Sequence, residues 1–174
     1  KYQNNIEVDS LKRLDYTSDE AETKFRYERV ILTDGYRINA GAGMEYANYT
    51  NSTFRQSFLS GQTLTIDYTT NLDLFRWNVF GQVSKSFFQG DLSLSLGFRA
   101  DANNYSSSMS NLIDQASPRF SLSYQFDPRW SFNFNTGRYY QLPPYTTLGF
   151  GNQQGDLLNK ENGLKYISAD HLVA

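Results

Sequence analysis

Apolar and polar side chains alternate with a period of two along most of the chain, which is typical of β-strands whose two faces meet different surroundings. The clearest example covers residues 91–101. Its apolar row is Leu92, Leu94, Leu96, Phe98 and Ala100, and its polar row is Ser93, Ser95, Gly97, Arg99 and Asp101. We therefore predict a strand here with one apolar and one polar face.

The same alternation predicts further strands on both sides of this segment. They are expected over 23–32, 38–46, 75–84, 119–126 and 130–137, and another begins near Lys165 and ends with the chain at Ala174. Two residues interrupt the pattern, because Phe80 stands in a polar row and Arg29 in an apolar row. The pattern thus predicts about six strands plus the start of a seventh.

The connections between these strands alternate between short and long. Short connections at 33–36, 88–91 and 127–129 carry Gly or Pro, as tight hairpin turns require. Long polar connections occupy 50–71, 102–117 and 139–164. Outer-membrane barrels have short periplasmic turns and long extracellular loops in this way. The first twenty residues do not alternate, and we expect them to end another long outer loop, with spacing that permits a short helix.

The length of the strands fits a membrane. The apolar row from Leu92 to Ala100 spans about 23 Å at a rise of roughly 3.3 Å per residue and a tilt of roughly 40°, and the apolar band of such barrels is about 25 Å tall. We therefore predict an all-β fold, a transmembrane antiparallel up-and-down β-barrel. Because such a barrel needs at least about eight strands, residues 1–174 are expected to be part of a single barrel domain, completed by strands outside this chain.

Composition agrees with a barrel wall and excludes several other classes. Aromatic residues make up 16% of the chain, with 13 Tyr and 13 Phe, yet the mean hydropathy is −0.59. A barrel wall combines high aromatic content with a polar mean hydropathy in this way, and so does a secreted binding module. The absence of cysteine excludes disulfide scaffolds and thiol catalysis, and a net charge of −2 with scattered charges indicates no nucleic-acid partner. No apolar run reaches 18 residues and no signal pattern follows Lys1, so we expect a mature or internal segment that meets a membrane through strands.

Charged residues on the polar rows are the first candidate functional groups. Glu45, Arg76, Arg99 and Arg119 are expected to face the lumen and to pair with a neighbouring strand or with a plug, because a buried charge needs a partner. His171 is the only histidine, so a histidine-based triad or metal site lacks its other members. We therefore expect no catalytic residues, no metal site, no cofactor and no enzyme activity.

A second candidate site lies where a predicted strand runs into a long loop. Tyr139, Tyr140, Gln141 and Tyr145 surround the pair Pro143-Pro144, which restricts the backbone of the loop root. Consecutive strand residues point to opposite faces, so one of the two adjacent tyrosines faces inward. We predict that these four residues contact a ligand. The alternative is that the aromatic rings only anchor the barrel at the membrane interface.

Residues 116–148 resemble one family of barrels. The strand Ser117-Pro118-Arg119-Phe120, the turn around Asp127-Pro128, and the strand end Gly137-Arg138-Tyr139-Tyr140-Gln141-Leu142-Pro143 follow each other as in the mid-barrel of TonB-dependent outer-membrane receptors of the Bacteroidetes group. The resemblance implies a barrel of about 22 strands with a plug domain, placed in the outer membrane of a Gram-negative bacterium. It also implies uptake of a scarce nutrient driven by a TonB-type energy-coupling protein.

The resemblance further implies the partners of the chain, which are outer-membrane lipid, the protein's own plug domain, the coupling protein and, as a further candidate, a surface lipoprotein. Two other functions stay open at this point. One is a passive porin or an outer-membrane barrel enzyme, and the other is a secreted all-β adhesin or binding module. The sequence leaves open whether the ligand is a siderophore, a vitamin, a glycan or a peptide.

Overall fold

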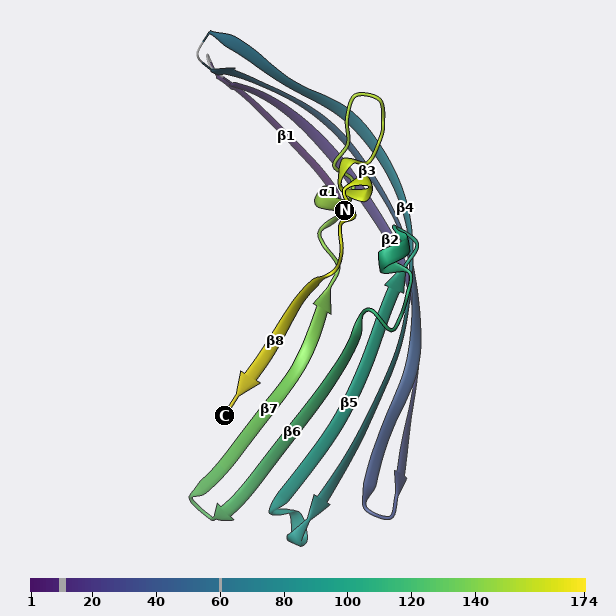
Figure 1. Ribbon diagram of the computed structural model, residues 1–174, viewed down its shortest axis with the longest axis vertical. Coiled ribbons are helices and arrows are strands. Elements are labelled where there is room, and N and C mark those ends of the chain that lie inside the picture. The colour runs from purple at the N-terminus through teal and green to yellow at the C-terminus, as the bar shows by residue number, and fades with distance from the viewer. Residues whose placement is uncertain (10–11, 60) are drawn as a thin grey trace. The chain divides into compact units, whose positions relative to one another are not determined.

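A computed structural model describes residues 1–9, 12–59 and 61–174, and its main feature is one antiparallel sheet of eight strands (Figure 1). Each strand pairs with the next along the chain, so the all-β, up-and-down topology is confirmed. The strands are β1 (Tyr2–Asp9), β2 (Lys12–Thr33), β3 (Tyr36–Leu59), β4 (Gln62–Phe87), β5 (Leu92–Asn103), β6 (Ala116–Asp127), β7 (Trp130–Gln141) and β8 (Ile167–Val173). Short helical turns are η1 (Phe88–Gly90), η2 (Ser107–Met109), α1 (Tyr145–Leu148) and α2 (Leu158–Glu161).

Within those residues, no helix has the length and apolar character needed to cross a membrane.

The chain divides into two compact units, which we describe separately. Unit 1 comprises Lys1–Thr23, Glu45–Phe75 and Pro143–Lys165, and unit 2 comprises Lys24–Met44, Arg76–Leu142 and Tyr166–Ala174. Each has a small buried core. The core of unit 1 includes Ala47, Tyr49, Leu72, Leu74 and Leu148, and that of unit 2 includes Ala100, Ala102, Tyr105, Met109 and Tyr166. That residues 1–174 belong to a single barrel domain stays a prediction.

The pairing register in unit 2 brings like rows together. Leu96 lies opposite Val83 on one side and Phe120 on the other, whereas the preceding residue, Ser95, lies opposite Ser84 and Ser121. The match continues into β7, where Leu122 faces Phe134 and Ser121 faces Asn135. The sheet therefore has an apolar face, which carries Leu96, and a polar face, which carries Ser95. The predicted alternation is confirmed over β4 to β7.

The three short turns lie where the sequence places them. Asp34 and Gly35 both have positive φ, 45° and 76°, as a two-residue hairpin turn of type I′ requires. Gln89 and Gly90, with φ of 59° and 112°, make the connection from β4 to β5. Pro128 and Arg129 form the turn between β6 and β7.

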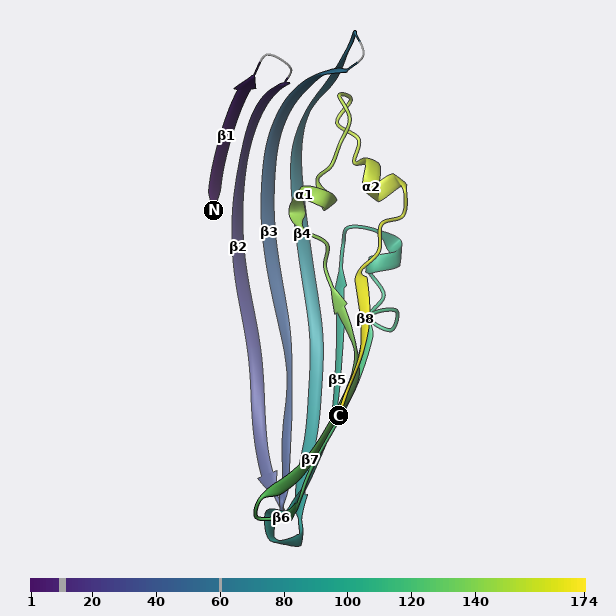
Figure 2. The same cartoon turned by 90° about the vertical axis from the view of Figure 1, so that its left-hand side faces the viewer.

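Two predictions made for the other end of the strands are wrong. The first twenty residues are not the end of a loop, because β1 pairs with the start of β2 from Tyr2 opposite Asp19 to Asp9 opposite Lys12. Most of the expected loop 50–71 is also strand, since β3 continues to Leu59 and β4 begins at Gln62. Figure 2 shows β1, β2, β3 and β4 side by side in chain order. Tyr2, Ile6 and Val8 share one row of β1, and Leu64, Ile66 and Tyr68 share one row of β4. This alternation is weak among many amide, hydroxyl and charged side chains, and the sequence analysis did not identify it.

The strand count changes for the same reason. The six predicted strands correspond to β2 through β7 and the expected seventh to β8, so the strand that the sequence missed is β1. The other two long connections are shorter than predicted, because β5 ends at Asn103, β6 begins at Ala116 and β7 ends at Gln141. Residues 10, 11 and 60 lie outside the described residues.

Candidate functional site

Unit 1 contains a pocket of about 190 Å³ at the root of the loop that follows β7. Its lining includes Gln3, Tyr16, Ser18, Glu20, Tyr49, Pro144, Tyr145 and Thr146. We call it the tyrosine pocket. Tyr145 enters it because the chain turns there into the single-turn helix α1, in which the amides of Thr147 and Leu148 donate to the carbonyl of Pro144.

Tyr145 is held in the tyrosine pocket by stacking and by hydrogen bonding. Its ring stacks on Tyr49 with centroids 5.8 Å apart and an angle of 30° between the planes. Its hydroxyl donates to Glu22 Oε1 over 2.7 Å and lies 3.4 Å from Glu45 Oε1. A ring with contacts of both kinds presents its remaining surface in a fixed orientation, which lowers the entropy cost of binding.

The loop after Tyr145 packs closely on the strands of unit 1. Leu148 is fully buried, and the hydroxyl of Thr70 on β4 donates to the carbonyl of Gly149 over 2.5 Å. A Cβ atom at Gly149 would lie 2.9 Å from the ring of Tyr49, so only glycine allows the loop to approach this closely. The sequence gives no sign of this contact, because the partners are far apart along the chain.

A chain of hydroxyl and amide groups continues from Tyr49 along the strands. The hydroxyls of Tyr16 and Tyr49 lie 3.4 Å apart, Asn51 donates to Tyr49 over 3.0 Å, and Thr53 donates to Asn51 over 2.7 Å. Burial raises the pKa of Tyr49, and its contact with Tyr16 raises that pKa further, so the hydroxyl stays neutral at physiological pH. The pocket thus offers aromatic faces, neutral hydroxyls and carboxylates, which suit the binding of a polar solute.

The four predicted ligand-binding residues are divided between the two units. Tyr139, Tyr140 and Gln141 end β7 in unit 2, whereas Tyr145 belongs to unit 1. Tyr139 lies on the polar face, where the guanidinium of Arg119 is 4.4 Å from its ring centroid and the ring of His171 is 4.9 Å away. Tyr140 lies in the opposite row. Tyr139 is therefore the member of the pair on the polar face, which we predict to face the lumen.

The predicted lumen-facing residues are placed as follows. Arg76, Arg99 and Arg119 lie on the polar face of unit 2, where Arg99 is opposite Phe80 and Arg76 is opposite Asn103. Arg99 donates two hydrogen bonds, of 2.7 and 2.6 Å, to the carboxylate of Asp101 on its own strand. Glu45 lies in unit 1, next to the Tyr145 hydroxyl.

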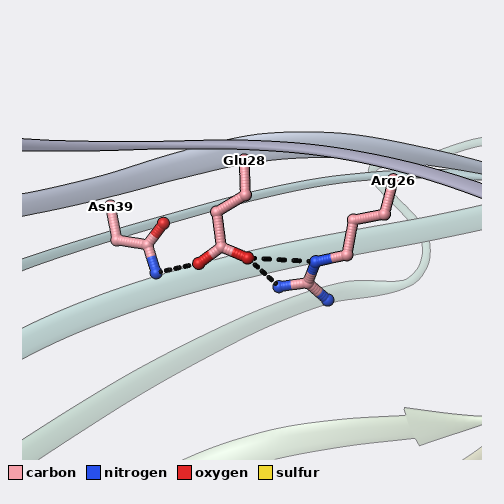
Figure 3. Close-up of polar contacts among 3 residues, drawn as sticks. All are labelled: Arg26, Glu28 and Asn39. Atoms are coloured by element: carbon pink, nitrogen blue, oxygen red, sulfur yellow. Dashed lines mark hydrogen bonds and ion pairs between the residues drawn. The ribbon is translucent and has the colours of Figure 1, made fainter.

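The structure also contains a polar cluster that the sequence analysis did not identify (Figure 3). Arg26 donates from Nε and Nη2 to Glu28 Oε2 over 3.1 and 2.8 Å, and Asn39 Nδ2 donates to Glu28 Oε1 over 2.6 Å. The Arg26 guanidinium lies 4.2 Å from the ring centroid of Phe80. One signal in the sequence could have revealed this cluster, namely that Arg26 and Glu28 alternate with Phe25 and Tyr27.

Among the described residues, no three His, Cys, Asp or Glu side chains are grouped closely enough to hold a metal ion. Comparison with protein-family models gave a match over residues 2–169 to the model described as TonB dependent receptor-like, beta-barrel. Comparisons with curated proteins and with solved structures gave no match.

Proposed function

Because the chain belongs to the TonB-dependent receptor-like β-barrel family, we propose that it forms part of the wall of an outer-membrane receptor that takes up a scarce nutrient. The match covers residues 2–169 of the 174 residues. Members of this family are receptors and transporters, not enzymes. Membership implies the outer membrane of a Gram-negative bacterium, and we propose that location for this chain.

The observation that best supports this proposal is the apolar face of unit 2. Leu96 is 64% exposed and Phe98 is 47% exposed, in the middle of a strand whose neighbours present Val83 and Phe120 beside them. An apolar face of this kind needs a cover, and hydrocarbon supplies one along a whole strand. The exposed aromatic residues Phe126 and Trp130, beside the turn of β6 and β7, suit the membrane interface.

We propose that the ligand binds at the end of the strands opposite the three short turns. β7 leaves its short turn at Trp130 and ends at Gln141, and Tyr145 follows within four residues. In barrels of this kind the short turns are periplasmic, so the tyrosine pocket is extracellular in this proposal. Tyr145 is its proposed ligand contact. Tyr139, Tyr140 and Gln141 lie at the end of β7 in unit 2, and we propose them separately as ligand contacts.

The partners in the proposal are those of the family. They are outer-membrane lipid, a plug domain of the same protein and a TonB-type energy-coupling protein, with a surface lipoprotein as a further candidate. The particular resemblance of residues 116–148 to receptors of the Bacteroidetes group remains part of the proposal. So does the assignment of residues 1–174 to a single barrel domain.

The proposal is tested by deleting the gene for the full-length receptor and measuring growth as one nutrient class at a time becomes limiting. The classes are siderophore-bound iron, vitamins, glycans and peptides. The deletion strain is expected to grow normally when the nutrient is abundant and to stop growing at low concentration of one class only. Normal growth at all concentrations of every class would contradict uptake by this receptor. Slow growth of the deletion strain at a high concentration of the nutrient would instead indicate that the receptor acts as a passive pore.

A further inference from the structure

The polar face of unit 2 contains a hollow of about 260 Å³ around which three arginines gather. Its lining includes Arg26, Asn39, Gln82, Arg99 and Arg119. The sequence predicts that Arg99 and Arg119 face the lumen, but it does not predict this for Arg26. The three come from β2, β5 and β6, so the hollow exists only in the folded sheet.

Glycines beside Arg119 leave space around its side chain. On the polar face, Arg119 lies between Gly97 on β5 and Gly137 on β7 in the pairing register. A Cβ atom at Gly137 would lie 3.1 Å from Arg119 Cγ, and one at Gly97 would lie 3.6 Å from Arg119 Cβ. The two positions directly opposite Arg119 therefore carry no side chain.

The charges around the hollow do not balance. Arg26 is paired with Glu28 and Arg99 with Asp101, each through its Nε and Nη2 atoms. Arg119 contacts the ring of Tyr139 and, within the described residues, has no carboxylate partner. One positive charge is left over. Within the described residues, the Nη1 groups of the two paired arginines donate no hydrogen bond.

We propose that this hollow is an anion seat that binds one carboxylate group, with Arg119 as its main contact and Arg26 and Arg99 at its border. A carboxylate fits because its two oxygens match the parallel N–H groups of a guanidinium, and because a single negative charge balances the single excess positive charge. The ring of Tyr139 lies against Arg119 and limits the directions in which its guanidinium can point.

The carboxylate has two possible sources. One is an Asp or Glu side chain from another part of the full-length receptor, and the other is a carboxylate on a solute that passes through the lumen. Both have the same chemistry at Arg119. They differ in whether the seat is filled when no solute is added.

The test measures how fast phenylglyoxal modifies individual arginines of the purified full-length receptor, with and without an excess of acetate, as read by mass spectrometry. Arg129 is the matched control, because it lies exposed in the turn between β6 and β7. If the receptor supplies the carboxylate, Arg119 should react at least about tenfold more slowly than Arg129 without acetate, a difference of about 1.4 kcal/mol. If a solute supplies it, the same protection should appear only when acetate is present. Fast modification of Arg119 under both conditions would overturn the proposal.

A second measurement separates pairing with a carboxylate from simple steric cover. If protection occurs without acetate, the thermal midpoints of the wild-type receptor and of Arg119→Gln are compared from pH 7 to pH 3. A carboxylate paired with Arg119 has a lowered pKa, so its stabilising effect is present above about pH 4, the ordinary pKa of Asp and Glu, and is lost as the pH falls further. The deficit of Arg119→Gln should therefore shrink toward low pH, while Arg129→Gln shows no deficit. A deficit independent of pH would mean that Arg119 is only covered, and would overturn the proposal.

Discussion

Replacing Leu96 by arginine should destabilise the barrel much more than replacing its neighbour Ser95. Leu96 is the central residue of the apolar row that runs from Leu92 to Ala100, so its side chain lies near the middle of an apolar band of about 25 Å. It is 64% exposed and contacts the membrane if the apolar face meets lipid. An arginine at the bilayer midplane costs about 2–4 kcal/mol.

The same substitution at Ser95 meets different surroundings. Ser95 lies on the polar face, where its hydroxyl accepts hydrogen bonds from Gln82 over 2.9 Å and from Ser84 over 3.0 Å. Loss of these bonds costs about 0.5–1.5 kcal/mol each, but the new guanidinium remains in a polar environment. The two bonds together amount to about 1–3 kcal/mol. We expect the cost of Ser95→Arg to lie in the lower part of this range, because Gln82 and Ser84 remain hydrogen-bonded to each other. The two variants should differ most where lipid is present.

The assay is urea unfolding of the full-length receptor reconstituted in phospholipid vesicles, followed by tryptophan fluorescence. Leu96→Ala is the control for loss of the leucine side chain alone, and its cost is subtracted before the two arginine variants are compared. A larger remaining cost at Leu96 supports a lipid-facing row. Equal costs at both positions would show that Leu96 does not face lipid and would favour a soluble sandwich, in which both faces lose packing.

Three further outcomes follow from the same account. On intact cells, a protease or an antibody against an inserted tag should reach the loop at 152–162 but not the turns at Asp34-Gly35 and Gln89-Gly90. Access to those turns would reverse the proposed orientation. Alanine at Tyr139 or at Tyr145 should weaken nutrient uptake by more than about tenfold, or roughly 1.4 kcal/mol, without lowering the amount of folded receptor; lower receptor yield with unchanged affinity would make these residues interface anchors. Gly41→Val should lower the yield of folded receptor, as measured on a heat-modifiability gel, because a Cβ atom there would lie 2.2 Å from the carbonyl oxygen of Tyr27 and 2.4 Å from the ring of Phe80. Normal yield would show that Phe80 is not held against this glycine.

The sequence predicts best those strands whose two rows differ in polarity. β5, β6 and β7 were found with nearly correct bounds because an apolar row alternates with a row of polar or small residues in each of them. β1 and the outer parts of β3 and β4 were missed although apolar side chains such as Ile6, Val8, Leu64 and Ile66 lie in one row there, because polar and charged side chains surround them. Backbone hydrogen bonds and neighbouring strands hold such segments in the sheet, and hydrophobic periodicity carries no information about either.

The candidate sites depended on pairing that the sequence does not contain. Tyr145 was predicted to contact a ligand, but its stacking on Tyr49 and its hydrogen bond to Glu22 join residues separated by about a hundred positions or more. Phe80 was noticed only as a break in a polar row. In the structure its ring lies beside Arg26, and the absent side chain of Gly41 leaves room for it. Local patterns therefore identified the residues but not their partners.

The central claim is that the chain belongs to an energy-coupled receptor of the outer membrane, and the most direct measurement separates binding from uptake. Cells that carry the full-length receptor are given the radiolabelled limiting nutrient, with the TonB-type coupling protein either present or deleted. The account predicts that nutrient bound at the cell surface is unchanged in the deletion strain, while nutrient accumulated inside falls to the level of cells that lack the receptor. Accumulation that continues at the same rate without the coupling protein would contradict the account and would identify the barrel as a passive pore.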